Sequence, residues 1–71
     1  METVLMFATV LQVYGCELLV RDLTTSQEII VHTMLASCFA VGENVSISYN
    51  GAMTLSIPPQ ITAIDLHRIS C

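Results

Sequence analysis

Residues 3–13 read TVLMFATVLQV and contain no charged residue, no proline and no glycine. The density of Val, Thr and Phe in this run favours a β-strand over the competing helix, because β-branched and aromatic side chains pack well on a pleated surface. Apolar side chains occur on both faces of the expected strand. Such a strand needs cover on both sides, so we expect it to bend and to serve as the first strand of a closed sheet.

The length of the chain, 71 residues, fits one domain, residues 1–71. Hydrophobic residues make up 54% of it and charged residues only 11%, where about 25% charged is usual. This composition excludes a disordered chain. It also supplies more apolar material than the interior of a small domain needs, so we expect part of it to face a partner.

The remainder of the chain alternates between short apolar runs and turn residues. Asn50-Gly51 is the strongest hairpin signal, because a type I′ turn needs positive φ at both central residues. Met34–Phe39 lacks strand-forming residues at its centre and suits a helical turn, with Thr33 as its cap. Further strands are expected at 17–22, 28–33, 45–49, 53–57 and 61–69, the last with alternate residues on opposite faces.

These elements are most economically arranged as an all-β fold, a small five-stranded Greek-key barrel of the OB type with one short helical turn after the third strand. Closure of the barrel would remove the open strand edges that so apolar a sheet exposes. The alternative is a β-meander that pairs its edges in a dimer.

The segment 41–64, VGENVSISYNGAMTLSIPPQITAI, resembles a group of small bacterial OB-like domains of unknown function, many from Gram-positive bacteria and some attached to secreted lipoproteins. The resemblance covers about a third of the chain, and Glu43 stands where Asp is common. It implies an OB-like fold and no particular activity. The matching positions are Val41, Gly42, Val45, Ile47, Tyr49, Asn50, Gly51, Ser56, Pro58, Gln60, Ile61 and Ala63.

The charge balance argues against nucleic acid as a partner. The net charge is −4, there is no lysine, and the two cations are Arg21 and Arg68. Nucleic-acid binding takes much of its affinity from cations that neutralise phosphates. We therefore expect a non-catalytic interaction module that contacts another protein or itself. The alternative is single-stranded nucleic-acid binding by the OB face, on aromatic side chains; the aromatic residues are Phe7, Tyr14, Phe39 and Tyr49.

The stretch Ser56-Ile57-Pro58-Pro59-Gln60 is the most distinctive in the chain. In the functional interpretation it forms a binding rim for a peptide or small ligand, made by Tyr49, Ser56, Pro58, Pro59 and Gln60. In the structural interpretation the prolines interrupt a strand so that it turns a corner, since neither can donate a backbone hydrogen bond. Gln60 would then satisfy the freed backbone groups.

No pattern of residues predicts catalysis, a cofactor or a metal. His32 and His67 with Cys38 or Cys71 lack the spacing of a zinc site, and Cys38 with His32 lacks an orienting third residue. We expect reduced cysteines, two of them, Cys16 and Cys38, packed as small hydrophobes. The possible carboxylate pairs, Asp22 with Asp65 and Glu17 with Glu28, are read as surface charges.

No apolar run approaches the roughly 20 residues of a membrane span. The first residues are acidic where a secretory signal is basic. From these two observations we expect a cytoplasmic protein that does not enter a membrane.

Overall fold

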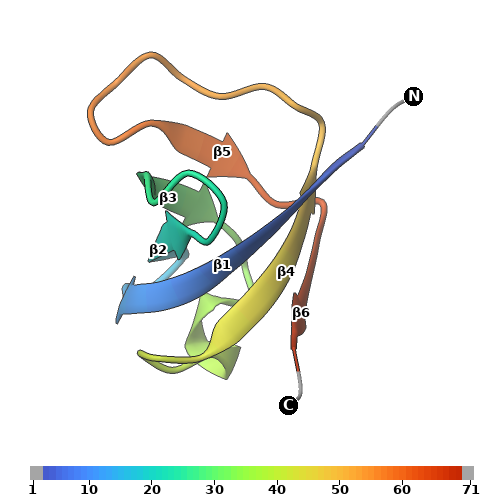
Figure 1. Ribbon diagram of the computed structural model, residues 1–71. Coiled ribbons are helices and arrows are strands. Elements are labelled where there is room, and N and C mark those ends of the chain that lie inside the picture. Colours follow the sequence, from blue (N-terminus) through green and yellow to red (C-terminus); the bar gives the residue numbers. More distant parts are fainter. Residues whose placement is uncertain (1–2, 70–71) are drawn as a thin grey trace.

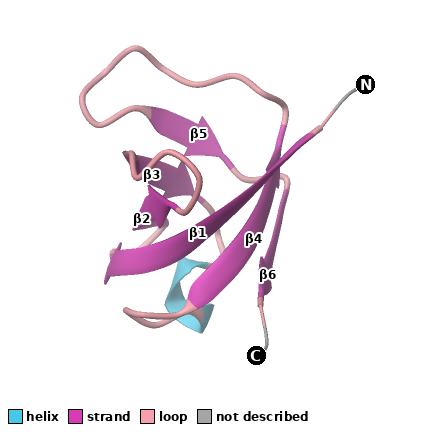
Figure 2. Cartoon of the chain, viewed as in Figure 1, coloured by secondary structure: helices cyan, strands magenta, loops and turns pink. Residues whose placement is uncertain are grey.

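The computed structural model describes residues 3–69, and its fold is all-β with a single 3-10 turn (Figure 2). That turn, Ala36–Cys38, lies where a helical turn is predicted. Its N-cap is Leu35, so the prediction of Thr33 as the cap is wrong; the Thr33 hydroxyl instead accepts a hydrogen bond from the Leu35 N–H. The strands are β1 (Val4–Val13), β2 (Glu17–Asp22), β3 (Glu28–His32), β4 (Asn44–Tyr49), β5 (Gln60–Thr62) and β6 (Asp65–Arg68).

All six strands belong to one sheet in the order β5-β3-β2-β1-β4-β6, and the sheet curls into a half-barrel (Figure 1). Four of the pairings are antiparallel, and the pairing of β3 with β5 is parallel. β1 lies between β2 and β4, and each half of β1 pairs mainly with one of these two strands. Residues 4–9 pair with β4, and residues 8–13 pair with β2.

β1 contains a β-bulge at Leu11, within the half of the strand that pairs with β2. The register with β2 shifts between Val10 and Gln12, so one residue of β1 has no partner there. A bulge of this kind increases the twist and bends the strand. It also changes which residues face inward: Val10 is buried, and after the bulge Val13 rather than Gln12 packs against the core.

The core consists of the inward-facing side chains of every strand together with Ala36 of the 3-10 turn. Nearly all are aliphatic, and within residues 3–69 no polar or charged residue is buried apart from Tyr49, whose ring lies among them. They form one continuous cluster: Met6, Ala8, Val10, Leu18, Val20, Ile29, Val31, Ala36, Val45, Ile47, Tyr49, Ile61 and Leu66.

The prediction that β1 is covered on both faces is wrong. Met6 and Ala8 point into the core, whereas Leu5 and Phe7 are about half exposed on the outer face. The sheet has one layer, and no second layer within the described part of the chain packs on the outside. The apolar surplus of the sequence is therefore at the surface.

The prediction of a strand at Met53–Ile57 is also wrong. The side-chain oxygen of Asn50 accepts a hydrogen bond from the Ala52 N–H. Among residues 3–69, positive φ occurs only at Ser26, Gly42 and Gly51. A type I′ hairpin needs positive φ at Asn50 as well. The chain therefore leaves β4 in a long loop, residues 50–59, which Figure 1 shows running from the end of β4 to β5.

The expected last strand, 61–69, is divided into β5 and β6, which gives six strands rather than five. β5 pairs with β3, and β6 pairs with β4 at the opposite end of the sheet order. Between them the Ala63 N–H donates to the His32 carbonyl and the Ile64 N–H to the Ser48 carbonyl. Ile61 and Leu66 are both buried, so the inward face changes phase and the regular alternation predicted for this segment fails.

The Arg68 side chain links β6 to residues 38–43, which precede β4. Its guanidinium forms an ion pair with Glu43, donates to the Cys38 carbonyl at 2.7 Å and lies 5.4 Å from the centre of the Phe39 ring. The hydrogen bond from Arg68, and after it the one from the Ala40 N–H, lower the pKa of Glu43 below its ordinary value, although desolvation acts in the opposite direction.

We expect this pair to make the folded state sensitive to acid. A carboxyl whose pKa is lower in the folded than in the unfolded chain stabilises the fold above its unfolded pKa, about 4.3 for Glu, and the stabilisation is lost as the pH falls toward the folded pKa. Glu43→Gln should therefore lower stability at neutral pH and flatten its decline in acid. Urea unfolding between pH 7 and 3 measures both effects. Arg68→Gln should flatten the same acid slope; an unchanged slope in both variants would contradict this account.

Candidate functional site

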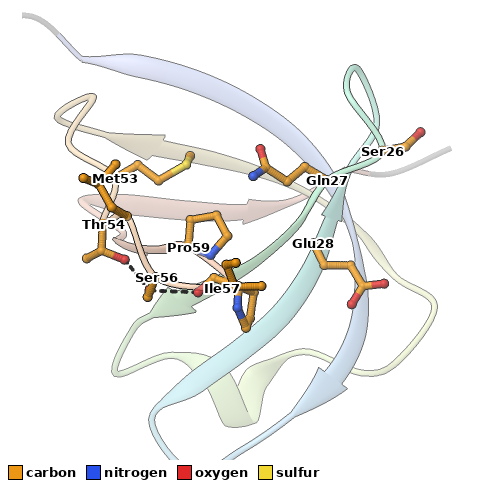
Figure 3. A pocket seen from close by; sticks show the side chains of 10 residues that line it. Ser26, Gln27, Glu28, Met53, Thr54, Ser56, Ile57 and Pro59 are labelled. Atoms are coloured by element: carbon orange, nitrogen blue, oxygen red, sulfur yellow. Dashed lines mark hydrogen bonds between the residues drawn. The ribbon is translucent and has the colours of Figure 1, made fainter.

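The 50–59 loop is held in place by its own hydroxyl groups. The Thr54 hydroxyl lies 2.7 Å from that of Ser56 and accepts from the Gln60 N–H at 2.9 Å. The Ser56 hydroxyl donates to the Pro58 carbonyl at 2.9 Å. These bonds substitute for the ladder that the prolines cannot form, and Figure 3 shows those of Ser56 beside Pro59.

The loop is also attached to the sheet. The Ile30 N–H on β3 donates to the Pro59 carbonyl at 2.9 Å, and the Thr54 N–H donates to the Gln60 carbonyl at 3.0 Å. Together with the hydroxyl bonds, these contacts fix the backbone on both sides of the two prolines. The loop is therefore an ordered projection from the end of the sheet.

Two aliphatic side chains project from this ordered loop into solvent. Leu55 is fully exposed and Ile57 is 99% exposed, the highest values among the large hydrophobic residues of the described chain. Between the loop and the β2–β3 turn lies a groove of about 710 Å³, which has the loop residues Met53–Pro59 on one side and Ser26–Glu28 on the other (Figure 3). The candidate site is this groove and the two side chains beside it.

A polar row crosses the outer face of the sheet next to the groove. Glu17 on β2 lies 3.3 Å from His32 Nδ1 on β3, and His32 Nε2 lies 2.6 Å from Gln60 Oε1 on β5. All three side chains are partly exposed. The Gln60 side chain thus bonds to a histidine, and the freed backbone groups that it was predicted to satisfy are satisfied by Thr54 and Ser56.

The structure brings together four of the five residues predicted for the rim. Ser56, Pro58 and Pro59 line the groove, and Gln60 follows them directly at the start of β5. Tyr49 is separate, because its side chain lies in the core. Leu55, Ile57 and the Thr54 hydroxyl were missed. Their signal in the sequence is the alternation of apolar and hydroxyl side chains just before Pro58-Pro59, a pattern that predicts a strand.

The two arginine side chains of the protein are each paired with a carboxylate. Arg21 on β2 bonds to Glu28 on β3 at 3.2 Å, and Arg68 is occupied by Glu43. The two arginines are the only Lys or Arg residues in the sequence. Every cationic side chain of those two types is therefore already paired with a carboxylate.

The predicted carboxylate pairs do not share a site. Glu17 bonds to His32 and Glu28 to Arg21, and β2 and β3 run antiparallel with these contacts at opposite ends of the ladder. Asp22 accepts from the Thr24 N–H. Asp65 bonds to His67 at 2.9 Å, and this hydrogen bond lowers the pKa of Asp65.

The thiols and histidines are likewise separate. Cys16 and Cys38 are free and exposed, so the prediction that both are packed as small hydrophobes is wrong; Cys71 lies outside the described residues. The polar contacts of the His32 ring go to Glu17 and Gln60 rather than to Cys38. Within residues 3–69 no group of three or more His, Cys, Asp or Glu side chains could hold a metal ion.

No known protein family, curated protein or solved structure matches this chain. No helix in the described part of the chain is long and apolar enough to span a membrane.

Proposed function

We propose that this chain is a small OB-like module that binds another protein through the exposed aliphatic side chains of the 50–59 loop. The observation that carries the proposal is the full exposure of Leu55 and Ile57 on a loop whose backbone is fixed by hydrogen bonds. An apolar anchor on an ordered loop suits protein recognition, because binding buries the side chains without the entropic cost of ordering the loop.

The OB-like assignment is supported by the pairing of the strands. β1, β2 and β3 are consecutive antiparallel neighbours, β1 also pairs with β4, and β3 pairs in parallel with β5. If β5 and β6 are counted as the two halves of one strand between β3 and β4, these are the pairings of a five-stranded Greek-key barrel. In that fold the loop before the last strand commonly binds oligonucleotides or oligosaccharides, so its position supports a binding role and the choice of a protein partner rests on the observations below.

Two observations favour a protein over a nucleic acid as the partner. Both arginines are bound to carboxylates, so no unpaired Lys or Arg is left to neutralise a phosphate. The groove carries Glu28 and otherwise neutral side chains. Within residues 3–69 the contacts of the histidines and thiols give no support to a catalytic role, and the module acts by binding alone.

We expect the double variant Leu55→Ser, Ile57→Ser to lose its protein partner while it keeps its fold. The measurement is quantitative mass spectrometry of proteins retained from lysate on the immobilised chain, compared between parent and variant. Leu35→Ser is the matched control, because Leu35 is also an exposed leucine but does not line the groove. A protein that is retained by the parent and by the control variant, but not by the double variant, supports the proposal.

Two results would contradict the proposal. One is a set of retained proteins that the loop substitutions do not change. The other is tight binding of a labelled single-stranded oligonucleotide that weakens as salt rises, which would point to the nucleic-acid alternative.

A further inference from the structure

The 50–59 loop begins with Asn50-Gly51, the one asparagine in the sequence that a glycine follows. The pair comes directly after Tyr49, the last residue of β4, and neither residue takes part in the ladder. Both residues are exposed, and Gly51 has a φ of +88°. Figure 1 shows the chain leaving the end of β4 here and running into the loop. The pair is therefore open to water and free of the constraint that strand pairing imposes.

An asparagine followed by glycine can react with its own backbone. The Gly51 amide nitrogen, once it has lost its proton to water, forms a bond to Asn50 Cγ, and the Cγ–Nδ2 bond breaks with release of ammonia. Water then opens the resulting five-membered imide at either carbonyl and leaves aspartate or isoaspartate. Glycine favours ring closure because it has no Cβ to crowd the attacking nitrogen or to restrict rotation of the backbone.

The loop places a hydrogen-bond donor on the oxygen that becomes charged in this reaction. The Ala52 N–H donates to Asn50 Oδ1 at 3.0 Å. Negative charge collects on Oδ1 as the nitrogen adds to Cγ, and a backbone donor held in this position stabilises that charge. Among residues 3–69 the Gly51 N–H has no hydrogen-bond acceptor, so no hydrogen bond has to break before the nitrogen attacks.

Asn44, the other asparagine of the sequence, lies within a strand and provides an internal comparison. It pairs with Thr9 in the ladder, and its Oδ1 accepts from the Thr9 hydroxyl at 2.7 Å. The residue that follows, Val45, is β-branched, fully buried and paired with both β1 and β6. Ring closure at Asn44 therefore requires the sheet to open first, because the attacking nitrogen belongs to Val45.

We propose that Asn50 is a site of spontaneous deamidation, which places a new carboxylate at the base of the 50–59 loop. The net charge of −4 becomes more negative by one. In the isoaspartate product the backbone runs through the former side chain, so one more carbon atom separates the end of β4 from Leu55 and Ile57. The reactants are the chain itself and water, and the site is independent of the partner proposed for the loop.

Incubation of the full chain in mildly alkaline buffer, followed by peptide mass spectrometry, tests the proposal. Chymotrypsin cleaves after Tyr49, so Asn44 and Asn50 fall in different peptides, and a zero-time sample corrects for reaction during digestion. We expect Asn50 to deamidate at least roughly tenfold faster than Asn44 in the folded chain. Aspartate and isoaspartate peptides should both appear, because the imide opens at either carbonyl.

The chain unfolded in guanidinium chloride separates the effect of the fold from that of the sequence. Unfolding should speed the reaction at Asn44, which is held in a ladder, but should speed that at Asn50 by no more than roughly threefold. Asn50→Ser should abolish the acidic form that accumulates on anion exchange. The proposal would be overturned by a smaller ratio of the two rates in the folded chain, by a larger acceleration of Asn50 on unfolding, or by an acidic form that persists in Asn50→Ser.

Discussion

Leu18→Ala is expected to destabilise the folded protein by about 2–5 kcal/mol, the usual effect of removing a buried leucine side chain. Leu18 lies on β2, is fully buried and belongs to the continuous core cluster. Small domains have a total stability near the lower end of roughly 5–15 kcal/mol. This one substitution should therefore remove a large part of the free energy of unfolding, as measured by urea titration with circular dichroism.

The matched substitution Leu55→Ala should change the free energy of unfolding by less than about 0.5 kcal/mol. It removes the same atoms, but Leu55 is fully exposed and its side chain is surrounded by water in the folded and the unfolded chain. Equal losses in the two variants would mean that Leu55 contributes to the core and that the loop does not project as described.

Gly51→Ala is expected to cost about 1–2 kcal/mol of stability, because the φ angle of Gly51 is +88° and a residue with a Cβ is strained there. The added Cβ would also lie 3.4 Å from the Val4 side chain, a normal to close contact that gives no compensation for the strain. Thermal unfolding of the variant measures the loss.

Gly15→Ala is the comparison for this second prediction. Gly15 has no positive φ, and a Cβ built there meets nothing within 4 Å. We expect the stability to be unchanged or to rise by about 0.4–1 kcal/mol, because alanine restricts the unfolded chain more than glycine does. If Gly15→Ala cost as much as Gly51→Ala, positive φ would not be the cause.

Much of the fold could be predicted from local patterns. The bounds of β2 at Glu17–Asp22 match because turn residues flank a short apolar run, and in β4 the alternation of Val45, Ile47 and Tyr49 with serines matches the buried face. These strands have one face in the core and one in water. In such strands the apolar residues recur at every second position, and these positions are the buried ones.

The errors occur where alternation does not report burial. Thr54 and Ser56 alternate with apolar residues as in a strand, but their hydroxyls bond to the local backbone and compete with a ladder. This alternation predicts a strand at Met53–Ile57, whereas Leu55 and Ile57 lie exposed on a loop. In β1 the apolar outer face suggested a covering layer, whereas Leu5 and Phe7 are exposed, and no local pattern distinguishes the two cases.

The sequence feature that points to the candidate site is the pair of prolines, and no pattern of reactive or ligand-binding side chains points to it. Pro58-Pro59 correctly predicted an interruption of the strand at this segment, because two residues without an N–H must interrupt any ladder. The bond between His32 and Gln60 depends on the parallel pairing of β3 with β5, which brings together residues 28 positions apart. A contact of this kind follows from the topology of the sheet and has no signal in either local sequence.

The division of residues 60–68 between β3 and β4 has a consequence for synthesis of the protein. Both of those strands are translated well before the segment that covers their edges, so the edge of β3 stays uncovered until residue 62 has left the ribosome and the edge of β4 until residue 68 has done so. Uncovered edges are the sites at which growing chains aggregate or bind chaperones. The time between translation of β3 and β4 and translation of residues 60–68 therefore sets how long the chain is exposed to that hazard.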